Sequence, residues 1–143
     1  MRGSIGSAAT ILAALASAAT PLAPGSAAQP FDGSWQVVID CAPTPDGTRG
    51  YRWRFDAQVR DGSLLGQFHE PGTNASGTLS GIIRPNGDAL LRMNGNTGAP
   101  QYSVGQVAAG TPFHYTATAH FAATSGSGRR NELRQCDLTF TRN

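Results

Sequence analysis

Lysine is absent from this 143-residue chain, and all 11 of its basic residues are arginines. Without a lysine amine, Schiff-base chemistry and a lysine general base are excluded. The chain also lacks a run of about 20 strongly apolar residues, so a transmembrane helix and stable membrane insertion are not expected. The apolar spacing of an amphipathic helix is missing beyond residue 28, which leaves strands as the main expected element.

Residues 1–28 have the pattern of an export signal. Arg2 precedes an uncharged run over 5–19, two prolines follow, and 26–28 are small residues of the kind that signal peptidase reads. We therefore predict a signal peptide over 1–28, with an uncleaved anchor as the alternative that the short apolar run disfavours. The mature chain would begin near Gln29 and would be exported to the periplasm or secreted.

The remaining domain, residues 29–143, is long enough for one modest hydrophobic core. Removing Arg2 with the signal leaves 10 arginines (11 − 1) against 9 acidic residues, so the domain is nearly neutral. A general electrostatic attraction to nucleic acid is therefore not expected.

Cysteine is scarce: the chain contains Cys41 and Cys136, and both fall in the exported part. In an oxidising compartment a disulfide between them is the expected state. Such a bond would close almost the whole domain into one loop, which stabilises a small core by about 4 kcal/mol in the chain-entropy model. A free catalytic thiol is the alternative, and the expected compartment disfavours it.

Alternation of apolar and polar residues governs the domain. It is clearest over 51–60, where Tyr51, Trp53 and every second residue after them are apolar, and it recurs over 113–122. The pattern predicts a single all-β domain with eight strands and no helix. The expected strands are 35–41, 51–60, 63–69, 75–84, 89–94, 101–107, 113–122 and 136–140.

The two cysteines also indicate how the sheet closes. In an eight-stranded meander the last strand runs antiparallel to the first, so the end of one meets the start of the other. Cys41 lies at the far end of the first strand, Cys136 lies in the first half of the last, and each is in phase with the apolar residues of its strand. This favours a closed up-and-down barrel, which also removes both sheet edges. A two-sheet β-sandwich is the alternative.

The connections expected between these strands differ in length at the two ends of the barrel. Short turns at 61–62, 85–88 and 108–111 would close one end. Longer segments rich in Gly, Pro, Asn and Arg would surround the other end, the mouth; they are 42–50, 70–74, 95–100 and 124–130. Loops held on a rigid scaffold commonly carry function, so the mouth is the expected site.

The motif Gly33-Ser34-Trp35 at the start of the first strand resembles the Gly-x-Trp signature of calycin barrels, the group that includes avidins and lipocalins. That resemblance implies a basic residue of the last strand packed over the tryptophan, a role that Arg142 is placed to fill. The chain departs from avidins in having only two tryptophans, and from typical lipocalins in its length and lack of a helix. The sequence Phe-Asp-Gly-Ser-Trp over 31–35 is also similar to a set of uncharacterised exported bacterial proteins, which implies no function.

Seven residues at the expected mouth are candidates for ligand contacts: Arg49, Tyr51, His69, Asn96, His120, Arg129 and Arg130. Arginines from the first and last mouth loops would form a guanidinium cluster suited to carboxylate, sulfate or phosphate groups; a merely soluble outer face is the alternative. His114 and His120 share one strand face but would lie about 20 Å apart, too far to hold one metal ion. No metal site and no cofactor are expected.

These observations predict an exported, non-enzymatic binding module that takes a small or anionic ligand at its mouth. The alternative is a protein–protein module, such as an exported protease inhibitor or an envelope factor, whose loops contact a protein partner around a filled interior. A small hydrolase using His69, Glu70 and His120 is a third hypothesis, and no spacing in the chain fixes a nucleophile or a carboxylate pair for it.

Overall fold

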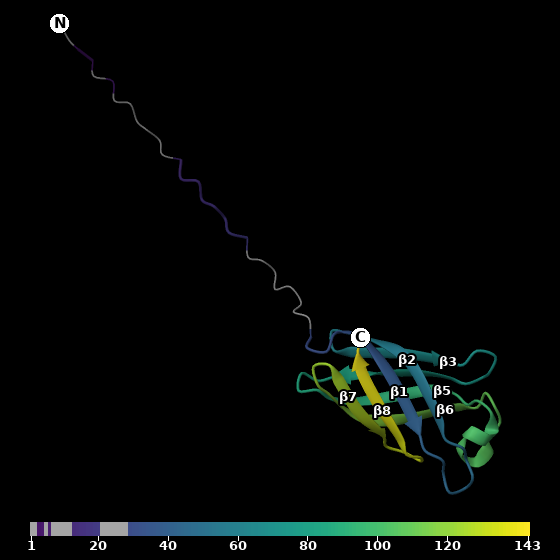
Figure 1. Ribbon diagram of the computed structural model, residues 1–143. Helices are drawn as coiled ribbons and strands as arrows, with labels where there is room; N and C mark the ends of the chain where they lie inside the picture. The colour runs from purple at the N-terminus through teal and green to yellow at the C-terminus, as the bar shows by residue number, and fades with distance from the viewer. Residues whose placement is uncertain (1–2, 5, 7–12, 21–28) are drawn as a thin grey trace.

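The computed structural model describes residues 3–4, 6, 13–20 and 29–143, and in this part of the chain the fold is a closed antiparallel β-barrel (Figure 1). Neighbouring strands pair in chain order, and β1 pairs with β8 to close the sheet. The strands are β1 (Gly33–Cys41), β2 (Tyr51–Arg60), β3 (Ser63–His69), β4 (Ser76–Ile83), β5 (Asp88–Asn96), β6 (Pro112–Phe121), β7 (Ser125–Arg130) and β8 (Cys136–Arg142). The predicted eight-stranded barrel is confirmed, and the sandwich alternative is wrong.

The predicted signal peptide over 1–28 lies largely outside the described residues, so it stays a prediction. None of the helices that the structure describes is long and apolar enough to span a membrane. The described helical elements are two short 3-10 turns between β5 and β6, η1 (Pro100–Tyr102) and η2 (Val104–Gln106).

The seam between β1 and β8 joins the two ends of the domain. Its ladder runs from Trp35 opposite Arg142 to Cys41 opposite Cys136. The last pair forms the disulfide that the phase of the two cysteines predicts. Both cysteines are buried, so the bond lies on the inner side of the sheet. It fastens the barrel where β1 ends and β8 begins, which is the mouth.

Alternation along each strand fills most of the barrel, because every second side chain points inward. In β2, Trp53, Phe55, Ala57 and Val59 are buried, and the residues between them are exposed. The inward residues of the other strands complete one hydrophobic core, including Val37, Ile39, Leu79, Leu91, Leu138 and Phe140. The inward faces predicted for 51–60 and 113–122 are therefore confirmed.

The end of the barrel opposite the mouth is plugged, and we call it the closed end. Trp35 is fully buried there, and its indole Nε1 donates a hydrogen bond to the carbonyl of Phe31 at 2.9 Å. The guanidinium carbon of Arg142 lies 5.3 Å from the centroid of the Trp35 ring. Arg142 also donates to the carbonyls of Ala123 (2.8 Å), Pro30 (3.3 Å) and Asp32. The packing expected of Arg142 over Trp35 is thus present.

One expected strand is wrong. Residues 101–107 form η1 and η2 instead of an extended segment. Pro100 begins η1, and Gly105 and Gln106 have positive φ angles of 76° and 47°. Such angles lie outside the β region, so the apolar alternation of this segment does not produce a strand.

One expected loop is wrong as well. Residues 125–130, assigned from the sequence to a mouth loop, form β7. This strand escapes the alternation pattern because Gly126 and Gly128 occupy its inward positions. A Cβ on Gly128 would meet the Cβ of Ala119 at 2.8 Å, so the crowded interior requires glycine there.

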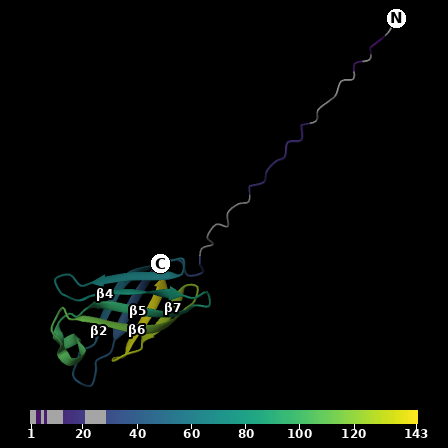
Figure 2. The same cartoon turned by 180° about the vertical axis from the view of Figure 1, so that it is seen from behind.

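Although one expected strand and one expected loop are wrong, the connections at the two ends of the barrel still differ in length. The closed-end turns are 61–62, 84–87 and 122–124, and the mouth connections are 42–50, 70–75, 97–111 and 131–135. The expected closed-end turn 108–111 therefore belongs to a mouth connection. Figures 1 and 2 show the helical turns of the 97–111 connection at the opposite end of the barrel from the C-terminus.

Candidate functional site

A cavity of about 680 Å³ opens at the mouth of the barrel. All four mouth connections and the strand ends beside them contribute residues to its wall. Its apolar lining includes Tyr51, Trp53, Tyr102, Val104, Val107 and Phe113. A cavity of this size falls within the range of about 300–1,000 Å³ that is typical of small-ligand sites. The barrel is therefore filled toward the closed end and hollow at the mouth.

The apolar wall of this cavity is mainly aromatic. Tyr51 and Trp53 occupy the two inward positions of β2 nearest the mouth, with ring centroids 5.2 Å apart. Phe113, at the start of β6, has its ring centroid 6.3 Å from that of Trp53. Phe68 of β3 stacks on Trp53 at 4.3 Å and restricts the position of its indole. The wall therefore presents flat, well-supported aromatic rings.

Arg130 is the last residue of β7 and lines the cavity. Its guanidinium carbon lies 4.0 Å from the ring centroid of Tyr115, and its Nε donates to the carbonyl of Glu132 at 2.8 Å. The two terminal nitrogens of Arg130 donate no hydrogen bond to a described residue. Burial lowers the pKa of Arg130, and the nearby charge of Arg134 lowers it further. An arginine nevertheless stays charged at physiological pH.

Arg134, in the 131–135 connection, lines the same cavity and is only 6% exposed. Its Nη1 donates to the carbonyl of Tyr102 at 2.9 Å, and its Nη2 donates to the carbonyls of Ala42 (2.6 Å) and Arg49 (3.1 Å). The guanidinium carbon lies 5.1 Å from the ring centroid of Tyr51. Arg134 thus ties three mouth connections together, while its buried Nε has no hydrogen-bond partner among the described residues.

Two of the three arginines that line the cavity have no paired anion among the described residues. In the described part of the chain the ion pairs are Arg52–Asp40, Arg129–Asp137 and His120–Asp88, all between exposed side chains. Neither Arg130 nor Arg134 belongs to them. Glu70 lines the cavity but is not paired with either arginine.

Two phenols accompany the arginines, that of the partly buried Tyr51 and that of the buried Tyr115. Burial raises the pKa of both Tyr51 and Tyr115, so each hydroxyl is neutral at physiological pH. Tyr115 lies beneath the guanidinium of Arg130, is 2% exposed, and its hydroxyl has no hydrogen-bond partner among the residues described. Unsatisfied buried polar groups are uncommon and each calls for an explanation.

The mouth connections are also held by a carboxylate. Asp46 accepts hydrogen bonds from the hydroxyls of Thr44 and Thr48, the latter at 2.8 Å, and from the backbone amide of Gly105 at 3.5 Å. Gln106 donates to the Thr48 hydroxyl at 3.2 Å. These bonds join the 42–50 connection to η2, so the helical turns that form one wall of the cavity are anchored.

The structure brings two of the seven predicted contact residues, Tyr51 and Arg130, into the cavity. Arg129 points to the outer face and pairs with Asp137 at 3.4 Å. Arg49 is exposed, and its carbonyl, rather than its side chain, takes part in the Arg134 contacts. The expected convergence of three arginines therefore does not occur, because successive residues of β7 face opposite sides of the sheet.

His69 and Asn96 lie at the mouth end but outside the main cavity. They line a shallow hollow of about 490 Å³ over β3, β4 and β5. Asn96 donates a hydrogen bond to the hydroxyl of Ser76 at 3.3 Å. As ligand contacts both residues stay predictions.

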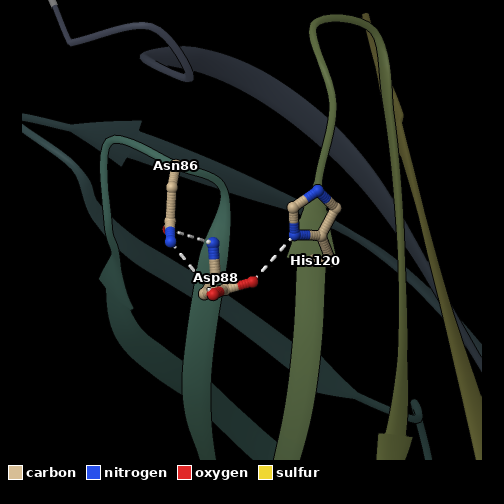
Figure 3. A network of polar contacts seen from close by, with 3 residues as sticks. All are labelled: Asn86, Asp88 and His120. Carbon is tan, nitrogen blue, oxygen red and sulfur yellow. Dashed lines mark hydrogen bonds and ion pairs between the residues drawn. The ribbon is translucent and has the colours of Figure 1, made fainter.

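The expected position of His120 at the mouth is wrong. His120 lies at the closed end beside the β4–β5 turn, with its Nδ1 2.8 Å from a carboxylate oxygen of Asp88 (Figure 3). Asn86 of the same turn donates to Asp88 and accepts from its backbone amide. The misplaced strand over 101–107 explains the error, because one extra strand reverses the direction assigned to the segment that contains His120.

Arg134 is the residue that the sequence reasoning missed. A signal for it was available: Cys136 must lie at the mouth to bond with Cys41, so a residue two positions earlier lies at the mouth rim.

No group of three His, Cys, Asp or Glu side chains within the described residues is arranged to hold a metal ion. Comparison with protein-family models, curated proteins and solved structures finds no match to this chain.

Proposed function

We propose that this protein is an exported, non-enzymatic binding module that holds a small molecule in its mouth cavity. The observation that carries the proposal is a cavity of about 680 Å³ with an aromatic wall and two arginines that lack a paired anion. Sites for small molecules are typically concave and mostly apolar, with a few placed polar groups that orient the ligand.

Unsatisfied polar groups at the mouth end support this proposal. An unsatisfied buried donor or acceptor destabilises a protein by about 1–3 kcal/mol, and the mouth contains two such groups, Arg134 Nε and the Tyr115 hydroxyl. Both lie at or directly behind the cavity wall. A region kept at such a cost to stability is more readily explained by a function at the mouth than by packing alone.

The hydrolase hypothesis finds less support. Glu70 lines the cavity, His69 lies over the outer hollow, and His120 lies at the closed end. A general acid or base must lie within hydrogen-bond reach of the reacting group, which these three positions do not share. The ionisable lining of the cavity is dominated by arginine and tyrosine, a composition that suits binding.

Export is the part of the proposal that rests on the sequence pattern over 1–28. The Cys41–Cys136 disulfide is compatible with an oxidising compartment. Sequencing the N-terminus of the protein from an exported fraction tests this point, and we expect it to begin near Gln29.

Binding is tested by a titration with anilinonaphthalene sulfonate, a fluorescent apolar anion, and by native mass spectrometry of protein isolated without refolding. We expect a saturable fluorescence increase that is lost in Ala99→Trp, which fills the cavity from its wall, and kept in Ala123→Trp at the closed end. A signal unaffected by Ala99→Trp, together with a native mass showing no additional compound, contradicts the proposal and favours the protein–protein alternative.

A further inference from the structure

The chemical class of the ligand follows from the hydrogen-bond donors that the cavity leaves unused. A guanidinium carries five N–H groups. Arg130 uses its Nε on the Glu132 carbonyl, so the N–H groups of its terminal nitrogens remain available. Arg134 donates three of its five N–H groups to backbone carbonyls, and its Nε is buried, so this residue, 6% exposed and part of the cavity wall, contributes mainly its charge.

These donors are held in place rather than mobile. Arg130 lies over the ring of Tyr115 at 4.0 Å and is bonded to Glu132, and Arg134 is bonded to three backbone carbonyls. Restricting a guanidinium before binding reduces the entropy lost when a ligand arrives. A planar anion with two oxygens matches N–H groups arranged in this way.

The number of charges favours a monoanion. Of these two arginines, Arg130 alone has terminal nitrogens that no described residue occupies, whereas the terminal nitrogens of Arg134 donate to three carbonyls. Glu70 also lines the cavity and would repel a second negative charge. A carboxylate therefore fits the free nitrogens of Arg130 better than a phosphate dianion does.

The remainder of the ligand meets aromatic rings. Trp53 lies 5.2 Å from Tyr51 and 6.3 Å from Phe113 between ring centroids, and all three line the cavity. Aromatic pairs favour offset-stacked or edge-to-face contact at such separations. A rigid planar ring gains from this contact and loses less conformational freedom on binding than a flexible chain does.

We infer that the mouth cavity binds a small aromatic carboxylate. The carboxylate accepts hydrogen bonds from the terminal nitrogens of Arg130, the charge of Arg134 in the same wall attracts it, and the aromatic ring packs against Tyr51, Trp53 and Phe113. This inference rests on the proposed function, because it requires that the cavity hold a small molecule.

Isothermal titration of the disulfide-bonded protein with three probes tests the inference. The probes are naphthoate, its uncharged analogue naphthalenemethanol, and decanoate, which has the carboxylate but no ring. We expect naphthoate to bind about tenfold more tightly than either of the others, since charge-assisted hydrogen bonds are roughly twice as strong as neutral ones and the rings reward a planar ligand.

Two variants test whether Arg130 is the residue that binds the carboxylate. Arg130→Gln should reduce the affinity for naphthoate to that for naphthalenemethanol, an expected loss of about tenfold. Arg129→Gln removes the same charge from the neighbouring position of β7 on the outer face, and it should leave the affinity unchanged. If Arg130→Gln does not fold, the comparison of the three probes on the unmodified protein still decides the question.

Each contrary result has its own meaning. Equal affinities for naphthoate and naphthalenemethanol contradict the inference that the ligand carries a carboxylate. Equal affinities for naphthoate and decanoate contradict the inference that it carries an aromatic ring. In both cases the proposed binding function stands. Absence of binding by all three probes and by anilinonaphthalene sulfonate overturns the inference and the proposed function together.

Discussion

The two ends of the barrel use the same pairing of an arginine with an aromatic ring for different purposes. At the closed end Arg142 lies 5.3 Å from the centroid of Trp35 and donates to three carbonyls. At the mouth Arg130 lies 4.0 Å from the centroid of Tyr115 and donates to one carbonyl, that of Glu132. Stacking on a ring therefore does not reveal the role of an arginine; the hydrogen bonds at its edge do.

Arg134 stands between these two cases. It donates to three carbonyls, as Arg142 does, but its Nε is buried and unsatisfied and it shares the cavity with Arg130. It therefore combines a structural role at the mouth rim with a place in the cavity wall. The fold itself makes the most use of Arg142, less of Arg134 and the least of Arg130. Substitution of each arginine by methionine tests this order.

The largest expected effect is that of Arg142→Met. Methionine keeps the apolar contact with Trp35 but leaves the carbonyls of Pro30, Asp32 and Ala123 without their donor. Hydrogen bonds to a charged group contribute about 1.5–3 kcal/mol each, and water replaces part of the loss at this partly exposed site, so we expect a destabilisation of about 3 kcal/mol. Urea unfolding measures it. A change below about 1 kcal/mol would show that the plug depends on Trp35 alone.

Arg134→Met should destabilise the protein less, by about 1–2 kcal/mol. The same number of carbonyl bonds is lost, but the substitution also removes an unsatisfied buried N–H and a positive charge close to Arg130. Urea unfolding gives the global value, and hydrogen exchange should show faster opening in the 97–111 connection, where Tyr102 loses its partner. Destabilisation equal to that of Arg142→Met would place Arg134 with the purely structural arginines.

Arg130→Met should change stability by no more than about 0.5 kcal/mol in either direction. The variant loses one bond to the Glu132 carbonyl, and in return it relieves the desolvation of a partly buried charge. The same variant should lose the anilinonaphthalene sulfonate signal. A loss of stability comparable to that of Arg134→Met would mean that Arg130 holds the barrel together rather than a ligand.

The alternation of residues such as Tyr51, Trp53 and Phe55 identifies most strands from the sequence, and the phase of Cys41 and Cys136 identifies the closure. Alternation failed where inward positions are glycine, because Gly126 and Gly128 carry no side chain to reveal the face. It also gave a false strand over 101–107, because the positive φ angles of Gly105 and Gln106 are incompatible with an extended backbone.

The candidate site could be placed at the correct end but not assembled from the sequence. Loop length and composition identified the mouth, and Tyr51 and Arg130 were found because they adjoin it. Whether a residue faces inward depends on strand register, so Arg129 and Arg130 could not be separated once β7 was assigned to a loop. Arg134 requires knowledge of three carbonyls from distant connections, which no local pattern supplies.

The smallest expected effect concerns pH, and it compares one aspartate from each end. At the closed end, amides of the β2–β3 turn, above all that of Gly62, lower the pKa of Asp32 below 3.8. At the mouth, the hydroxyls of Thr44 and Thr48 lower the pKa of Asp46. A carboxyl whose pKa is depressed in the folded state contributes stability above its unfolded pKa of about 3.8, and the contribution is lost as the pH falls through the folded value.

Melting temperatures of Asp32→Asn and Asp46→Asn should therefore lie slightly below that of the unmodified protein at about pH 5, and the differences should shrink as the pH falls below about 4. Hydrogen exchange separates the two ends: Asp32→Asn should accelerate exchange at Asp61 and Gly62, and Asp46→Asn at Gly105. Only the second variant should also weaken binding of anilinonaphthalene sulfonate, because only Asp46 anchors a wall of the cavity. Equal binding by both variants would show that the anchored turns are not needed to shape the site.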